Sequence, residues 1–304
     1  MAKFMELIKN DKKIDFIGKT KYFFLLSIFL IIVSIITVSF KGLNFGIDFV
    51  GGTVIQIKYE KAPDLSSLRK SISDLNLGDF AIQNFGEPNE VLIRLGKTKD
   101  MPLEELANII KSQLSKIDPN NKFTVERLEQ VGPQVGAELK YKATMALIYA
   151  TIGILIYVAI RFELIYAIGA ILALVHDVII TLGALSITGK EFNLTVVAAL
   201  LALIGYSLND TIVVYDRIME RLKQQAKEKV NLAYVMNISI NETLSRTIIT
   251  SLLTFLTVLS LLLFGGDVIN PFSFTLAIGI IVGTYSSIAV ASGLVYIIKN
   301  LKKK

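Results

Sequence analysis

Six stretches of the sequence are long and apolar enough to cross a lipid bilayer, and this constrains the fold more than any other feature. A spanning helix needs about 20 apolar residues, because each helical residue adds about 1.5 Å. The stretches are Tyr22–Phe40, Ala143–Ile160, Leu164–Ile187, Leu194–Tyr215, Thr247–Phe264 and Phe272–Ile298. Hydrophobic residues make up 53% of the chain and charged residues only 19%, against roughly 25% in soluble domains. The sequence therefore predicts a multi-pass α-helical membrane protein.

Basic residues predict the orientation of these helices. The N-terminal segment 1–21, the loop 216–246 and the tail 299–304 are rich in lysine and arginine, whereas the short loops on the other side contain only Lys190. Positive charge accumulates on the cytoplasmic side, so both termini are predicted to be cytoplasmic and the first helix an uncleaved signal-anchor. The net charge of +6 then indicates topology and contact with anionic lipid, with no support for nucleic-acid binding.

Residues 41–142 lie between the first predicted helix, which ends at residue 40, and the second, which begins at residue 143. They are expected to form a separate extracytoplasmic domain. Alternating apolar positions predict strands, and apolar positions at helical spacing predict helices, with Asp64 as an N-cap. The expected elements are a strand at 53–59, a helix at 64–75, strands at 80–85 and 90–95 joined around Pro88-Asn89, a helix at 102–117 and a strand at 123–129. This order is that of an α+β ferredoxin-like split βαβ unit.

Asp210 interrupts the fourth apolar stretch, where a carboxylate costs at least about 2.5 kcal/mol. Such a group usually carries an ion or proton, or pairs with a partner. Tyr206 and Ser207 lie one helical turn away and Asn209 is adjacent, so hydroxyl groups could bond the carboxyl group. Arg246 is a candidate counter-charge, since a long arginine side chain can reach along a helix. The alternatives are that Asp210 is an interfacial residue and Arg246 a basic anchor.

His176 and Asp177 lie near the middle of the third apolar stretch. Two adjacent ionisable groups at this depth suit either a proton relay or a buried pair that fixes helix packing. The glycines of Gly279-x-x-x-Gly283 favour close packing between helices. A lone carboxylate such as Asp210 suits H⁺ or Na⁺, and both alternatives stay open.

Several classes of protein are disfavoured. The chain has no cysteine and a single histidine, so thiol chemistry and multi-histidine metal sites are excluded, and no cofactor is expected. The cluster Gly46, Asp48, Gly51 and Gly52 lacks the Gly-Lys-Ser/Thr ending of a phosphate-binding loop and is interpreted as a turn at a domain junction. Asp177 and Asp210 lack the GxGD motif expected of an aspartyl intramembrane protease.

Five motifs together resemble the SecF family, the smaller subunit of the bacterial SecD–SecF protein-export complex. They are FGIDFVGGT at Phe45–Thr53, VGPQVGAEL at Val131–Leu139, VHDV at Val175–Val178, GYSLNDTIVVYDRIME at Gly205–Glu220 and NETLSRTIITS at Asn241–Ser251. The resemblance implies a half of the resistance-nodulation-division fold, in the inner membrane, with its large domain in the periplasm. By motif position, it also implies that Asp210 and Arg246 conduct protons.

The resemblance further implies partners and a mechanism. With SecD, the family uses the proton-motive force to complete preprotein translocation through SecYEG after the ATP-dependent step of SecA, and YajC and YidC are further candidate partners. Two other functions are alternatives. A small-molecule or lipid exporter of the same superfamily usually has twelve helices and two large domains in one chain. A scaffold would only stabilise a partner complex, and activity in Asp210 and Arg246 variants would favour it.

Overall fold

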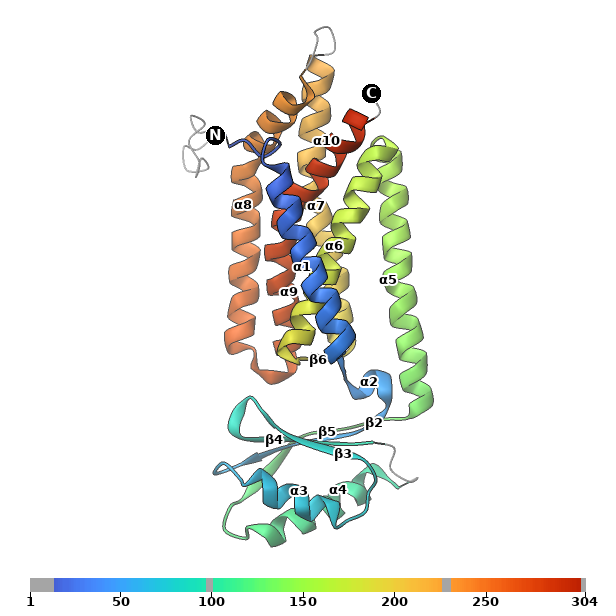
Figure 1. Ribbon diagram of the computed structural model, residues 1–304. Helices are drawn as coiled ribbons and strands as arrows, with labels where there is room; N and C mark the ends of the chain where they lie inside the picture. The colour runs from blue at the N-terminus through green and yellow to red at the C-terminus, as the bar shows by residue number, and fades with distance from the viewer. Residues whose placement is uncertain (1–13, 97–100, 226–230, 302–304) are drawn as a thin grey trace. The chain divides into compact units, whose positions relative to one another are not determined.

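The computed structural model describes residues 14–96, 101–225 and 231–301, which form two compact units. Within the described residues, one unit comprises 14–44, 146–225 and 231–301, and the other comprises 45–96 and 101–145. Six helices in the described residues are long and apolar enough to cross a membrane, as predicted (Figure 1). The basic residues that lie outside the described residues, and on which part of the predicted orientation rests, are Lys3, Lys9, Lys12, Lys13, Lys227, Lys229 and Lys302–Lys304.

The first unit is helical. Its elements are α1 (Thr20–Lys41), the end of α5 (Pro133–Arg161), α6 (Leu164–Thr188), the short strand β6 (Glu191–Phe192), α7 (Leu194–Gln224), α8 (Leu232–Phe264), α9 (Gly266–Ser286), a π-helical turn (Ser287–Ala291) and α10 (Ser292–Leu301). Helices α5, α7 and α8 extend beyond the predicted apolar stretches, because backbone hydrogen bonding continues through polar turns that a hydropathy criterion excludes. Helix α7 thus ends at Gln224 instead of Tyr215.

Helices α6, α7 and α9 form the interior of this unit. More than half of each apolar window is buried in these helices, whereas less than a fifth is buried in α1, α5 and α8. The outer helices present large apolar side chains such as Phe29, Ile156 and Leu253. Lipid tails are themselves apolar, so such a surface suits a bilayer, and close packing and hydrogen bonds must join the interior helices.

Glycine residues permit two of these close helix contacts. A Cβ at Gly183 of α6 would lie 2.2 Å from Ser34 Oγ of α1, and a Cβ at Gly279 of α9 would lie 2.5 Å from a methyl carbon of Leu203 on α7. The Gly279-x-x-x-Gly283 motif therefore serves helix packing, as its sequence suggested.

The second unit contains a four-stranded antiparallel sheet. After β1 (Asn44–Phe45), its elements are α2 (Ile47–Val50), β2 (Gly52–Tyr59), α3 (Leu65–Ser73), β3 (Phe80–Phe85), β4 (Glu87–Leu95), α4 (Leu103–Ile117) and β5 (Phe123–Val131). The strand order is β3-β4-β2-β5, and from β2 onward the elements follow the β-α-β-β-α-β order of the split βαβ unit. Helices α3 and α4 bury Leu68, Ile72 and Ile110 against Ile57 and Val91 of the sheet.

Two local predictions in this unit have different outcomes. The Asp64 carboxylate accepts hydrogen bonds from the backbone N–H groups of Ser66 and Ser67, both at 3.1 Å, so the predicted N-cap is confirmed. The turn predicted at Pro88-Asn89 is wrong, because both residues lie inside β4. The chain reverses two residues before Pro88, at Gly86, whose φ of 68° suits a tight turn.

Candidate functional site

Buried polar side chains gather where α6, α7, α8 and α9 pack together. Among the described residues of the helical unit, the buried carboxylates are those of Asp177 on α6 and Asp210 on α7, which are 1% and 3% exposed. Large apolar side chains cover much of the outer surface of this unit, whereas these two carboxylates lie on faces that meet inside it. The two carboxylates have different surroundings.

The Asp177 carboxylate is surrounded by hydrogen-bond donors. Ser207 Oγ of α7 donates to Asp177 Oδ2 at 2.7 Å, and Ser286 Oγ of α9 donates to the same oxygen at 2.8 Å. His176 Nδ1 lies 2.9 Å from Asp177 Oδ1. Gly283 leaves room for this contact, since a Cβ there would lie 3.1 Å from Ser207 Oγ. Asp177 therefore connects α6, α7 and α9.

Asp210 has one hydrogen-bond donor among the described residues. Ser251 Oγ of α8 donates to Asp210 Oδ2 at 3.2 Å. Thr284 Oγ1 of α9 lies 2.8 Å from Ser251 Oγ and 2.6 Å from the carbonyl oxygen of Ile280. The expected hydroxyl partners do not bond to Asp210. Ser207 is directed to Asp177, and the buried hydroxyl of Tyr206 has no hydrogen-bond partner in the described chain. Asp210 thus keeps acceptor positions that no described donor occupies.

Arg246 lies within α8, because that helix begins at Leu232 and not near Arg246 as predicted. Its side chain is exposed, and no ion pair joins it to Asp210 in the part of the chain that the structure describes. Asn209, also exposed, lies beside Asp210 on α7. Both polar groups are therefore on the outer surface of this unit.

The residues that bind the two carboxylates were mostly missed by the sequence reasoning. Ser251 and Ser286 occur in or near noted motifs, and Thr284 lies next to Gly283, but none had been given a role. Serine and threonine are common in membrane helices, and their hydroxyls usually bond to their own helix backbone. A polar residue one position after the Gly279-x-x-x-Gly283 motif is the available signal for Thr284.

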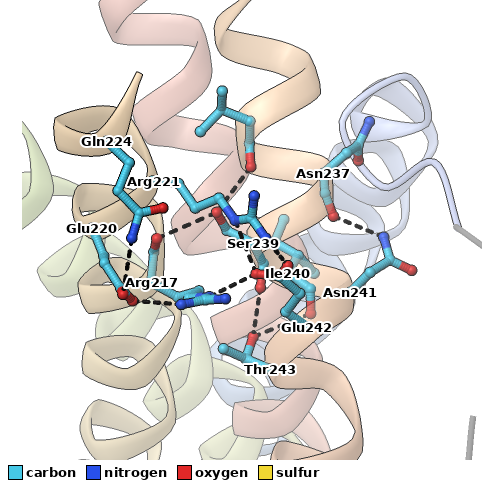
Figure 2. A network of polar contacts seen from close by, with 11 residues as sticks. Arg217, Glu220, Arg221, Gln224, Asn237, Ser239, Ile240, Asn241, Glu242 and Thr243 are labelled. Atoms are coloured by element: carbon cyan, nitrogen blue, oxygen red, sulfur yellow. Dashed lines mark hydrogen bonds and ion pairs between the residues drawn. The ribbon is translucent and has the colours of Figure 1, made fainter. Parts of the chain in front are cut away.

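A second polar network joins the C-terminal part of α7 to the N-terminal part of α8 (Figure 2). Arg217 Nε donates to Glu242 Oε2 at 2.6 Å, and Arg221 also pairs with Glu242. The segment before α1 is bound to α8. The Oδ1 atom of Asn237 on α8 accepts hydrogen bonds from the backbone N–H groups of Phe16 and Ile17, each at 2.9 Å. These contacts join the GYSLNDTIVVYDRIME and NETLSRTIITS motifs and hold the two helices in register.

Two further residues of the first of these motifs have structural roles. Tyr215 is fully buried, and its hydroxyl donates to the carbonyl oxygen of Ala291 at 3.2 Å. Its ring packs edge-on against Tyr166 of α6, with the centroids 4.9 Å apart. Asp216 forms an ion pair with Arg161 at the end of α5, with a distance of 2.7 Å. The motif thus combines one buried acid with residues that fix the position of α7.

The glycine cluster belongs to the other unit and serves its backbone. Gly46 precedes α2, and Asp48 lies in the first turn of that helix. Gly51 and Gly52 have φ values of 74° and 120°, and a Cβ at Gly52 would lie 2.4 Å from the carbonyl oxygen of Leu95. The cluster therefore forms a tight turn between α2 and β2, where side chains have no room.

A set of six helices long and apolar enough to span a membrane, with two buried aspartates in its interior, defines a multi-pass membrane protein with an intramembrane polar site. The family model for the SecD/SecF protein export membrane protein C-terminal region matches residues 109–301, and the SecD/SecF GG motif matches residues 36–63. The chain belongs to the SecD/SecF family of protein-export membrane proteins.

Full-length relatives and solved structures agree with this assignment. The chain is 73% identical to the protein translocase subunit SecF of Calditerrivibrio nitroreducens over 304 residues, which is all of both chains. It is 48% identical to SecF of Magnetococcus marinus, over 96% of this chain and 94% of that one. It matches the crystal structure of SecDF from Thermus thermophilus with a TM-score of 0.87 and 38% identity. The match covers 97% of this chain and 40% of that SecDF chain.

Proposed function

We propose that this chain is an accessory subunit of the Sec protein-export machinery. Together with SecD, it uses the proton-motive force to complete preprotein translocation through SecYEG after the ATP-dependent step of SecA. Family membership and the SecF relatives support the export role. Asp210 supports the proton coupling, since it is a buried carboxyl group whose one hydrogen-bond donor within the described residues is Ser251.

The energy available to such an acid is sufficient to bias a conformational change. Moving one charge through 100 mV yields about 2.3 kcal/mol, which is about a 50-fold shift between two conformations. Arg246 is proposed as the counter-charge for the ionised form of Asp210, since it occupies the matching position of the NETLSRTIITS motif. Loading and release of a proton at Asp210 would then alternately remove and restore this interaction.

SecD is the proposed partner of the helical unit. The chain matches only 40% of the SecDF chain of known structure, so a second chain would supply the remainder here. Asn209, next to Asp210 in the sequence, and Arg246 on α8 are both exposed, so helices of that second chain could contact them. SecYEG, SecA, YajC and YidC are proposed as further partners, with preprotein as the substrate.

The orientation is also part of the proposal. Both chain ends are placed in the cytoplasm, and the unit with the four-stranded sheet is placed on the extracytoplasmic side of the bacterial inner membrane. The distribution of basic residues supports this, because Lys190 is the one basic residue in the loop between α6 and α7, whereas Arg217, Arg221 and Lys223 lie near the end of α7.

Asp210→Asn is the direct test of proton coupling. The amide keeps the size and the acceptor oxygen for Ser251 but cannot exchange a proton. We expect stimulation of preprotein export by an imposed proton gradient to be lost, up to the about 50-fold limit set by 100 mV. Export should be measured in inverted membrane vesicles that contain the assembled complex.

Asp216→Asn is the matched control. It removes an aspartate from the same helix, but one that forms an exposed ion pair with Arg161. We expect this variant to retain the stimulation. Unchanged stimulation in Asp210→Asn would contradict the proposal.

Replacing the proton gradient with a sodium gradient in the same vesicles distinguishes coupling to H⁺ from coupling to Na⁺. Co-purification with SecD in mild detergent tests the proposed partner.

A further inference from the structure

His176 and Asp177 form the centre of a hydrogen-bond chain that joins four helices. On one side Asp177 accepts from Ser207 of α7 and Ser286 of α9. On the other side His176 Nε2 lies 3.1 Å from Ser27 Oγ of α1, which lies 3.0 Å from the hydroxyl of Tyr285 on α9. All of these side chains except Tyr285 are at most 3% exposed.

A count of protons shows which group donates and which accepts in each of these hydrogen bonds. The Tyr285 hydroxyl donates its only proton to the carbonyl oxygen of Phe23, at 2.7 Å, and a carbonyl oxygen can only accept. The bond between Ser27 and Tyr285 therefore uses the proton of Ser27. Ser27 then has to accept in its contact with His176 Nε2, so Nε2 carries a proton.

The same count of protons requires a proton between His176 Nδ1 and Asp177 Oδ1. Asp177 Oδ2 lies 2.7 Å from the Ser207 hydroxyl and 2.8 Å from the Ser286 hydroxyl, which is also 3.2 Å from the carbonyl oxygen of Gly283. Asp177 Oδ1 faces His176 Nδ1 at 2.9 Å. Two acceptors do not form a hydrogen bond, so one of these two atoms carries a proton. The pair holds this proton in addition to the one on Nε2. That is one proton more than a neutral imidazole and an ionised carboxylate contain.

We propose that His176 and Asp177 form a second proton-holding site in the membrane, separate from Asp210. The pair is neutral overall, either as imidazolium with carboxylate or as imidazole with carboxylic acid, and neutrality lowers the cost of burial in the bilayer. Tyr285 is the other titratable side chain in the chain of bonds. Through Ser207, one helical turn before Asp210, the site also fixes the part of α7 that carries Asp210.

The protonation of the pair can be measured directly, because His176 is the only histidine in the chain. Selective ¹⁵N-histidine labelling of the full chain in lipid gives one ring, with two nitrogen signals, in solid-state NMR. We expect a proton on Nε2 and a Nδ1 signal that is either protonated or strongly hydrogen-bonded. A ring with an unprotonated Nε2 would overturn the proposal.

Two variants make the test specific. Asp177→Asn removes the shared proton, so the Nδ1 signal should shift to that of a neutral ring; an unaltered Nδ1 signal would also overturn the proposal. Thr181→Val is the control, because the buried Thr181 hydroxyl donates to the Asp177 backbone oxygen at 2.7 Å and not to its carboxylate. Its ring signals should match those of the unmodified chain. Neither measurement involves export, so their outcome is independent of the Asp210→Asn result.

Discussion

Two buried aspartates in one helical unit differ in how completely their oxygens are bonded. Asp177 accepts two serine hydroxyls and contacts His176, so its oxygens are occupied and the residue is held in one place. Asp210 accepts from Ser251 among the described residues. A group that exchanges an ion needs free acceptor positions, and this difference favours Asp210 as the exchanging acid and Asp177 as the fixed one.

Asp64 provides a test of a single charged group outside the membrane helices. Hydrogen bonds from Ser66 and Ser67 to its carboxylate hold the pKa of Asp64 well below its usual value. A depressed pKa means that the ionised form stabilises the fold above the unfolded pKa of about 3.9, and that this contribution is lost as the pH falls through the folded pKa. We expect Asp64→Ala to lower the thermal unfolding temperature at pH 7, with a smaller difference below about pH 4.

The control for this variant lies at the other end of the same helix. Asp74 is at the C-cap of α3, where a negative charge opposes the helix dipole. Asp74→Ala should therefore leave the unfolding temperature unchanged or raise it. Circular dichroism of the full chain in detergent measures both variants. An Asp64→Ala effect that stays constant from pH 7 down to about pH 3 would contradict the electrostatic explanation.

At the scale of elements, the backbones of α1 and α6 approach each other closely at one point. Gly183 is the point of contact, where an added Cβ would lie 2.7 Å from the Cα of Ser34. Backbone atoms cannot move aside as a flexible side chain can. We expect Gly183→Ala to destabilise the protein by about 1–3 kcal/mol, the usual cost of overpacking, as measured by thermal unfolding in detergent.

Gly153→Ala on α5 is the matched control, because no heavy atom lies within 4 Å of its added Cβ. Replacing an unconstrained helical glycine by alanine should stabilise by up to about 1 kcal/mol. Equal effects of the two variants would show that the contact between α1 and α6 is not tight. A hydrogen bond also joins α6 to the C-terminal end of α1, because Ser186 Oγ of α6 donates to the carbonyl oxygen of Gly42, the C-cap of α1, at 2.6 Å.

At the scale of the whole molecule, the orientation in the membrane can be tested on the chain as it stands, because it contains no cysteine. Asp79→Cys places a thiol in the exposed loop before β3, and Lys223→Cys places one near the end of α7. We expect a membrane-impermeant maleimide added to intact cells to label Asp79→Cys alone. Lys223→Cys should react only after the membrane is opened. The reverse pattern would contradict the proposed orientation.

The sequence alone was sufficient for the features that depend on neighbouring residues. Six apolar stretches identify the spanning helices, since a bilayer requires each span to satisfy its own backbone hydrogen bonds. The strands and helices of the other unit, and the N-cap at Asp64, follow from local periodicity and capping chemistry. Asp210 could be singled out because the cost of a carboxylate in lipid depends on the residue type and its depth.

Only the tertiary structure decided which side chains meet. The helix faces that pack together cannot be read from hydropathy, because lipid-facing and buried surfaces are equally apolar. Ser207 was expected near Asp210, yet it bonds to Asp177, and Asp210 bonds to Ser251 from a helix distant in sequence. The packing of α6, α7, α8 and α9 brings serine hydroxyls within hydrogen-bonding distance of the buried carboxylates. The sequence thus determined that an acid lies in the membrane, and the packing determined its partners.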